Sequence, residues 1–82
     1  MTWVSQAAYR DVGRRLAAIR KRAGINQDQL AELLQKPQSF VSACERGQRR
    51  IDILELLRIA AALKLDPHEL FAALVGSENG MT

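Results

Sequence analysis

Apolar residues recur at helical spacing along most of the chain. Near the N-terminus, Val12, Leu16, Ile19 and Ala23 follow one another at steps of four, three and four residues, which aligns them on one helical stripe. Gly24 then interrupts the pattern, so we expect a helix from about residue 11, or somewhat earlier, to residue 23. Leu, Ala and Ile dominate the sequence and runs of β-branched residues are absent, which predicts an all-α fold.

Three later helices share one kind of start. A capping Asn or Asp is followed three residues later by Gln or Glu, and apolar residues stand just before the cap and four positions after it. This combination of a capping box and a hydrophobic staple marks a helix N-terminus. It occurs at Asn26–Gln29, Asp52–Glu55 and Asp66–Glu69, so helices are expected to begin near residues 27, 53 and 67.

The helix expected from Pro37 or Gln38 to Arg46 lacks such a start. No Ser, Thr, Asp or Asn stands at its beginning, and Gly47 ends it. Its first backbone N–H groups and the positive end of its dipole are therefore open to an anion such as phosphate, to a neighbouring Gln side chain or to water.

The two C-terminal helices are strongly apolar. The helix that begins near residue 53 has apolar residues around most of its circumference, which predicts a central buried helix; they are Ile53, Leu54, Leu56, Leu57, Ile59, Ala60 and Leu63. The last helix carries more apolar surface than the end of so small a domain needs, and part of it is expected to contact a partner subunit. These residues are Leu70, Phe71, Leu74 and Val75, before Gly76.

Length and composition narrow the class of protein. The 82 residues suffice for one small domain, expected at 11–75, without a separate catalytic or ligand-binding domain. The N-terminus lacks a basic segment followed by an apolar run, and no stretch approaches about 18 consecutive apolar residues, so neither a signal peptide nor a membrane span is expected. The single cysteine cannot form an internal disulfide, which suits a cytoplasmic protein.

Enzymatic chemistry is not predicted. Cys44 and His68 are the only residues of their types and fall on different expected helices, without an acid–base pair, a phosphate loop or metal-ligand spacing around them. We interpret Cys44 as a core residue and His68 as an exposed first-turn residue. No enzyme activity, metal or cofactor is therefore expected.

Charge is distributed unevenly. The net charge is +3, but residues 10–50 hold ten Lys or Arg against four acids, whereas residues 51–82 have a net charge of −3. The basic part contains the uncapped helix and favours a polyanionic partner. In the first helix, Arg14, Arg15, Lys21 and Arg22 lie mostly off the apolar stripe and form either a solvated face or phosphate contacts. Arg20, four residues beyond Leu16, lies near the buried face.

Both ends of the chain lie outside these patterns. Residues 1–10 contain Trp3 and Tyr9, two of the four aromatic residues. They form either an N-terminal arm or, with Ser5 as a cap, an extension of the first helix, and they either pack on the flank of the domain or contact a partner subunit or DNA. Residues 76–82 are expected to form a flexible tail.

Two short helices separated by a tight break, as expected for residues 26–47, are the core of a helix-turn-helix, whose second helix can enter a DNA major groove. Residues 20–47 resemble the phage repressor/Cro helix-turn-helix family, also called the xenobiotic-response-element type, and the similarity extends from about residue 12 to residue 74. The matching features are weak singly and specific in their order and spacing: Gly24-Ile25-Asn26-Gln27, Leu30-Ala31, Gln38-Ser39 with Val41-Ser42, Glu45-Arg46-Gly47, and Ile59-Ala60-Ala61-Ala62-Leu63.

The resemblance implies a compact five-helix, lambda-repressor-like DNA-binding domain whose recognition helix spans about 38–46. The family's base-reading positions match Gln38, Ser39, Ser42 and Ala43. A Gln amide can pair with N6 and N7 of adenine, Ser can bond several bases, and Ala can only touch a thymine methyl group. Phosphate-binding positions, which orient a protein on DNA without reading sequence, match Gln27, Arg46, Arg49 and Arg50, and we assign Lys36 to the same phosphate-binding set.

The resemblance also implies structural roles. Gln27 matches the family residue that supports the first residue of the recognition helix, here Gln38. Arg20 and Glu45 match an ion pair that joins the first helix to the recognition helix and, where partly buried, orients that helix more than it stabilises the fold. Val41 and Cys44 match core positions.

Three positions depart from the family pattern. Gln35 replaces a common turn glycine, so either the turn is altered or a non-glycine residue has a positive φ. Ala43 replaces a longer polar residue, which makes base readout sparse. Phe40 replaces a small or polar residue; we interpret it as packing on the flank of the preceding helix, with contact to a sugar, a thymine methyl group or a partner as alternatives.

We therefore predict a sequence-specific transcriptional regulator that binds double-stranded DNA as a homodimer on a palindromic operator, with Leu70, Phe71, Leu74 and Val75 at the dimer interface. The alternative is an antitoxin or other protein-interaction module, whose main partner is a toxin or another regulator. Trp3 and the apolar last helix are compatible with that alternative. The basic half of the chain, the uncapped helix and the Gln27–Gln38 pair favour DNA.

Overall fold

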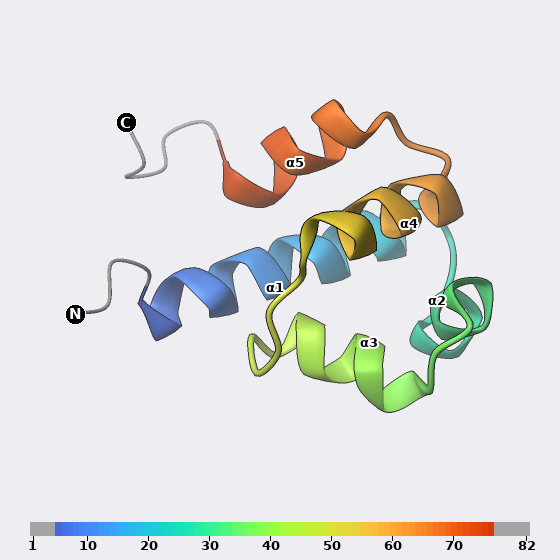
Figure 1. The fold of residues 1–82 in the computed structure, drawn as a ribbon, viewed down its shortest axis with the longest axis horizontal. Helices are drawn as coiled ribbons and strands as arrows, with labels where there is room; N and C mark the ends of the chain where they lie inside the picture. The colour runs from blue at the N-terminus through green and yellow to red at the C-terminus, as the bar shows by residue number, and fades with distance from the viewer. Residues whose placement is uncertain (1–4, 77–82) are drawn as a thin grey trace.

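The five helices of the computed structural model surround one apolar core (Figure 1). The structure describes residues 5–76, and their helices are α1 (Gln6–Arg22), α2 (Gln27–Leu34), α3 (Gln38–Glu45), α4 (Ile53–Leu63) and α5 (Pro67–Val75), with no strand among them. α1 lies in the middle, packed against α3 on one side and α5 on the other, while α4 packs on α2 and α5. This confirms the predicted all-α, five-helix fold.

The predicted helix starts at residues 27, 53 and 67 are confirmed. In α2, the side chain of Asn26 accepts a hydrogen bond from the backbone N–H of Gln29 at 2.8 Å, and the Gln29 side chain accepts one from the backbone N–H of Asn26 at 2.8 Å. Asp52 and Glu55 form the same reciprocal pair at the start of α4. α5 begins with Asp66 as its cap and a proline in the first turn, which has no N–H to satisfy.

α1 begins earlier than residue 11. Ser5 is its N-cap and accepts a hydrogen bond from the backbone N–H of Ala8, so residues 6–10 form the helical extension rather than an arm. Within the described residues, the helices therefore run from residue 6 to residue 75. Residues 1–4, which include Trp3, and residues 77–82 of the expected tail lie outside the described residues.

The apolar core draws residues from all five helices. Its buried members are Leu16, Ile19, Leu30, Ala31, Val41, Cys44, Ile59, Ala60, Leu63, Leu70 and Leu74. Ala23 does not join the stripe of α1, because it follows the last helical residue and is exposed.

The prediction of α4 as a central buried helix is wrong. Ile53, Leu54 and Leu57 are 75%, 64% and 44% exposed. α4 packs on α2 and α5 with one face, so only that face is covered. Apolar residues around a helix show what can be buried, but not which sides have a neighbour.

The predicted dimer interface on α5 needs a similar correction. Leu70 and Leu74 are 0% and 4% exposed, because these residues, one turn apart, face α1 and α4 in the core. They are unavailable to a partner. Phe71 is half exposed and Val75 is partly buried, so these two remain from the predicted set.

Arg15 joins α1 to α5. Its guanidinium donates a hydrogen bond to the backbone carbonyl of Leu74 at 3.1 Å, in the last turn of α5. A cation at this position satisfies a terminal carbonyl and complements the negative end of the helix dipole. Arg15 is therefore not part of a fully solvated basic face.

Candidate nucleic-acid interface

α3 lies at the edge of the fold (Figure 1). The side of this helix that faces away from the core carries polar and small residues. Its inward face is buried against α1 and α2 through Val41, Cys44 and Glu45. On the other face the four expected base-reading residues lie next to each other, since positions i, i+1, i+4 and i+5 share one side of a helix. Of these, Gln38 and Ser39 are exposed, and Ser42 and Ala43 are partly exposed.

The start of α3 has no side-chain cap. Pro37 occupies the capping position, no hydrogen bond from a side chain caps the helix, and its first turn contains no acidic residue. This confirms the predicted uncapped start. The first-turn N–H groups and the positive end of the helix dipole are compatible with an anion such as a DNA phosphate.

In the turn between α2 and α3, Gln35 adopts a left-handed backbone conformation although it is not a glycine. Gln35 has φ 57° and ψ 45°, and its N–H bonds the carbonyl of Glu32 at 3.1 Å. Of the two alternatives for this departure, the structure therefore shows a non-glycine residue at positive φ. Such a residue costs about 1–2 kcal/mol relative to an unstrained backbone.

A buried ion pair joins α1 to the end of α3. Arg20 Nε lies 2.6 Å from Glu45 Oε2, and a second guanidinium nitrogen lies 3.1 Å from Glu45 Oε1. The two side chains are only 8% and 6% exposed. Arg20 also donates to the carbonyl of Ile25, at 2.9 Å, so the guanidinium bonds both the segment before α2 and the last residue of α3.

The ion pair is continued to the surface by two glutamines. Gln27 Nε2 donates to Glu45 Oε1 at 2.8 Å, and Gln38 Nε2 donates to Gln27 Oε1 at 2.5 Å. A chain of hydrogen bonds therefore leads from buried Arg20 in α1 to exposed Gln38, the first residue of α3. Since an amide group has two N–H donors and one carbonyl acceptor, Gln38 retains capacity for a further partner.

Gly13 allows α1 and α3 to approach closely, and sequence reasoning missed it. A Cβ atom at this position would lie 2.4 Å from the carbonyl oxygen of Glu45 and 2.6 Å from that of Cys44. The only sequence signal was a glycine inside a helical pattern, where it costs about 1 kcal/mol relative to alanine. This contact sets the position of the end of α3 that carries Glu45.

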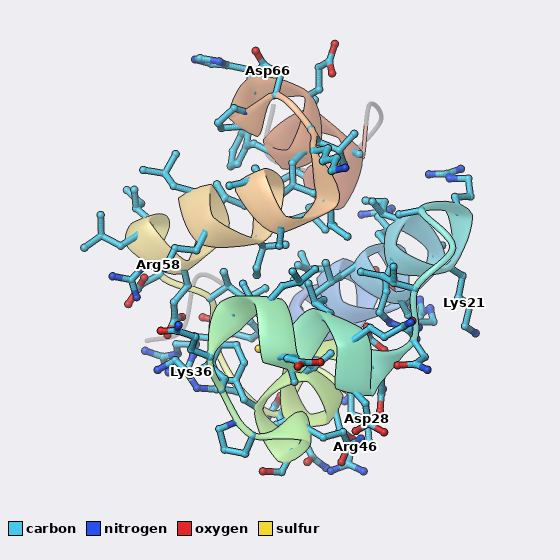
Figure 2. All side chains as sticks on the ribbon, turned by 90° about the vertical axis from the view of Figure 1, so that its right-hand side faces the viewer. Lys21, Asp28, Lys36, Arg46, Arg58 and Asp66 are labelled. Carbon is cyan, nitrogen blue, oxygen red and sulfur yellow. The ribbon has the colours of Figure 1, made fainter. Side chains whose placement is uncertain are left out.

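Three expected phosphate-binding cations are exposed near α3. Lys36 lies just before the helix and Arg46 is its C-terminal cap, and the two project from opposite sides of the α2–α3 region (Figure 2). Arg46 donates to the side chain of Gln48 at 3.2 Å. The guanidinium carbon of Arg50 is 5.7 Å from the centre of the Tyr9 ring.

Arg49 differs from the expectation. Its two terminal nitrogens lie 2.8 and 2.9 Å from the two carboxylate oxygens of Glu55, a bidentate ion pair within the protein. Its guanidinium carbon is also 4.5 Å from the centre of the Phe40 ring, which is partly buried and packs against the apolar core. The hydrogen bond from Arg49 is the main cause that lowers the pKa of Glu55, and the same bond raises the pKa of Arg49.

Residues 5–76 show no group of three or more His, Cys, Asp or Glu side chains arranged to hold a metal ion. Among the same residues, no helix has the length and apolar character needed to cross a bilayer.

Comparisons with known proteins agree with this geometry. A family model described as helix-turn-helix matches residues 16–70. The restriction-modification controller protein C.AhdI from Aeromonas hydrophila is 38% identical with a TM-score of 0.74, over 80% of this chain and 96% of that one. An XRE-family like protein from Pseudomonas syringae pv. tomato str. DC3000 is also 38% identical, with a TM-score of 0.71 over 83% of each chain.

A third structure, the clp gene regulator ClgR from C. glutamicum, has a TM-score of 0.78 over 90% of this chain and 96% of its own, at 22% identity, and shares the fold. No curated protein sequence matches the chain. The family match and the 38% identities show the class: the chain belongs to the helix-turn-helix family of the phage repressor/Cro type, whose members are DNA-binding transcription regulators.

Proposed function

We propose that this protein recognises a specific DNA sequence by inserting α3 into the major groove. The observation that carries the proposal is the hydrogen-bond chain that ends at Gln38. A side chain held in place before binding loses less conformational entropy when it meets a base edge, which favours specific contact. Gln38 reads a base in this proposal, with Ser39 and Ser42 as further hydrogen-bonding groups and Ala43 restricted to apolar contact.

Phosphate contacts then fix the position of α3 along the groove. Lys36 and Arg46 stand at the two ends of the helix, and both are exposed. Together with Gln27, Arg50 and the uncapped start of α3, they form the proposed backbone-binding set. Arg49 is omitted from this set, because Glu55 already occupies its guanidinium.

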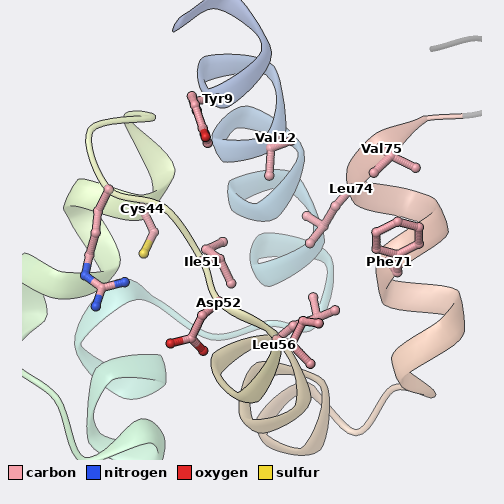
Figure 3. Close-up of a pocket in the computed structure, with 11 residues that line it drawn as sticks. Tyr9, Val12, Cys44, Ile51, Asp52, Leu56, Phe71, Leu74 and Val75 are labelled. Atoms are coloured by element: carbon pink, nitrogen blue, oxygen red, sulfur yellow. The ribbon is translucent and has the colours of Figure 1, made fainter. Parts of the chain in front are cut away.

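The regulator acts as a homodimer in this proposal. An apolar groove of about 230 Å³ lies between α1, α4 and α5 (Figure 3), and its rim includes Ile53 and Phe71, which are 75% and 50% exposed. Burying these residues against a second copy would remove apolar surface from water. Two copies related by a two-fold axis place their recognition helices about 34 Å apart on a palindromic operator.

A protein partner remains the second candidate, favoured by further exposed apolar residues. Leu33 on α2 and Leu54 and Leu57 on α4 are 57%, 64% and 44% exposed. A toxin or another regulator would bind such a surface with little dependence on salt, whereas binding to DNA weakens steeply as salt rises.

Salt titration tests the DNA proposal. The logarithm of the affinity of the wild-type protein for a mixed-sequence duplex is expected to fall linearly with the logarithm of the salt concentration. Arg46→Gln and Arg50→Gln are each expected to reduce the slope of this line by about one. Lys64→Gln is the matched control, because this exposed cation lies at the end of α4 and outside the proposed interface. Absence of salt-dependent binding, or an equal effect of the control, contradicts the proposal.

Sedimentation tests the dimer separately. Phe71→Asp places a charge on the proposed interface and is expected to give a monomer with weaker DNA binding. Leu33→Asp is a comparable change at an exposed leucine of α2 that does not line the groove. If both variants retain the wild-type mass, or both lose it, the α4–α5 interface is wrong.

A further inference from the structure

Building on the proposed function, we infer that Arg49 is a positioning residue for the recognition helix: it clamps Phe40 in α3 to Glu55 in α4, and thereby controls how well α3 discriminates bases. The clamp consists of the side chains of Phe40, Arg49 and Glu55. Arg49 itself lies in the loop between α3 and α4, residues 46–52, and contacts both helices.

The contacts define the orientation of the Arg49 guanidinium. Two of its nitrogens bond the two oxygens of Glu55, and one of them also bonds the backbone carbonyl of Arg50 at 2.6 Å. The guanidinium carbon lies 4.5 Å from the centre of the Phe40 ring. A planar guanidinium can satisfy a carboxylate in its plane and contact an aromatic ring with its face, which a lysine ammonium cannot do.

Glu55 is a fixed anchor for this clamp. Its Oε1 also accepts the backbone N–H of Asp52 at 3.0 Å in the capping box of α4, and its side chain is only 11% exposed. A phosphate that bound Arg49 would leave this partly buried carboxylate without its cation, which is unfavourable. The ion pair therefore favours a role inside the protein over a direct phosphate contact.

Phe40 places the clamp where it affects DNA reading. It lies in the first turn of α3, two residues after Gln38 and next to Ser39. α3 packs on α1 and α2, and its far end is held by the Arg20–Glu45 ion pair. The clamp also attaches the first turn of α3 to α4. Loosening the clamp therefore frees the end of α3 that carries Gln38 and Ser39.

Three variants distinguish positioning from phosphate contact. Glu55→Gln keeps an oxygen that can cap α4 but removes the ion pair, Arg49→Gln removes the cation, and Arg49→Lys keeps the cation without the bidentate geometry. For a duplex enriched by the wild-type protein from a randomised library, positioning predicts a loss of affinity on the order of tenfold for all three, with the double variant Arg49→Gln/Glu55→Gln no weaker than either single one. The salt slope stays at the wild-type value in each.

Phosphate contact by Arg49 predicts the opposite pattern. Glu55→Gln then frees the arginine and tightens binding, Arg49→Gln reduces the salt slope by about one, and Arg49→Lys retains affinity. Arg46→Gln, at a proposed phosphate contact, is the control that shows what such a slope change looks like. Any of these three results for the clamp residues overturns the inference.

A measurement without DNA keeps this test separate from the proposed function. Amide hydrogen exchange of the free protein is expected to be faster, by about tenfold, in Glu55→Gln and Arg49→Gln at residues 42–45, whose amides are hydrogen-bonded to the first turn of α3, and unchanged in α1. Unchanged exchange in α3 contradicts the clamp whether or not the protein binds DNA. If the variants show the expected faster exchange but the wild-type protein binds no duplex, the proposed function and the role of the clamp in base discrimination are both contradicted. Only the attachment of α3 to α4 by the clamp then stands.

Discussion

Gln27 in α2 donates a hydrogen bond to Glu45 in α3 at 2.8 Å, at the same carboxylate oxygen that also accepts from Arg20. This shared oxygen connects the buried part of the fold with its surface. Because Gln27 in turn accepts from Gln38, the orientation of the proposed base-reading amide depends on a charge pair inside the core. We therefore expect the buried pair to affect the orientation of Gln38 as well as the stability of the fold.

Removing one member of the pair is expected to be strongly destabilising. Arg20→Met leaves the Glu45 carboxylate buried without its cation, and we expect a loss of about 3–5 kcal/mol in the free energy of unfolding, measured with urea. The double variant Arg20→Met/Glu45→Leu is expected to recover most of this stability but to lose base discrimination, since Gln27 and Gln38 lose their anchor. Full discrimination in the double variant would show that the pair does not orient α3.

Gly13→Ala tests the close approach of α1 and α3. Helix propensity alone predicts a gain of about 1 kcal/mol, because Ala is the better helix former. The added Cβ would meet two backbone carbonyl oxygens at 2.4 and 2.6 Å, so we expect a net loss of about 1–3 kcal/mol in thermal or urea unfolding. A gain in stability would contradict the packing described for these helices.

Gly24→Ala is the matched comparison for that variant. Gly24 has φ +81° and no atom within 4 Å of an added Cβ, so backbone strain acts there without a clash. The expected loss is about 1–2 kcal/mol. DNA binding should be unaffected by Gly24→Ala and weakened by Gly13→Ala, because only Gly13 lies against α3.

Gln35→Gly is expected to stabilise the protein. Gln35 and Lys64 end α2 and α4 with φ 57° and 60°, a conformation that glycine adopts without strain. We expect a gain of up to about 1 kcal/mol at either position, reduced by the greater freedom of glycine in the unfolded chain. Glycine at Glu32, inside α2, should instead lower stability by about 1 kcal/mol. Equal losses at all three positions would rule out relief of strain.

The sequence predicted where the helices begin better than it predicted which of their faces are buried. Capping residues such as Asn26 and Asp52 act within four positions of the chain, so the starts of α2 and α4 were predictable. The burial of Leu70 and the exposure of Ile53 depend on which neighbour covers each face, and helical spacing alone does not contain that information. Capping patterns are local, whereas burial is a property of the packed fold.

The candidate site shows the same limit. The Arg20–Glu45 pair was expected from the family resemblance, which supplies the long-range partner. The Arg49–Glu55 pair was not, because neither residue has a sequence signal that joins them beyond opposite charge six positions apart. Arg15, assigned from sequence to a solvated or phosphate-binding face, contacts α5 through a backbone carbonyl that no sequence pattern marks.

Acid is expected to weaken the Arg49–Glu55 ion pair. The folded protein lowers the pKa of Glu55 below its ordinary value of 4.5, chiefly through the hydrogen bond from Arg49. A lowered pKa gives stability that is fully present above 4.5 and is lost as pH falls through the folded value. The difference in free energy of unfolding between the wild-type protein and Glu55→Gln should therefore shrink below pH 4.5. A constant difference from pH 7 to pH 3 would show that this carboxylate is not held by Arg49.

Cys44 is expected to be unreactive in the folded protein. Its side chain is 2% exposed, and burial raises the pKa of its thiol, which disfavours the reactive thiolate. A thiol reagent at neutral pH should modify it only at the rate of opening or unfolding, and immediately in urea. Rapid modification of the folded protein would contradict the packing of α3 against the core.

Sequence recognition by α3 can be tested by selection from a randomised duplex library at moderate salt. The wild-type protein is expected to enrich a palindromic sequence, and Gln38→Ala is expected to relax the preference at one position in each half-site, at a cost of about 1–3 kcal/mol in discrimination. A library that stays random under the wild-type protein, with only weak and salt-sensitive binding, would contradict sequence recognition by α3 and point to a protein partner.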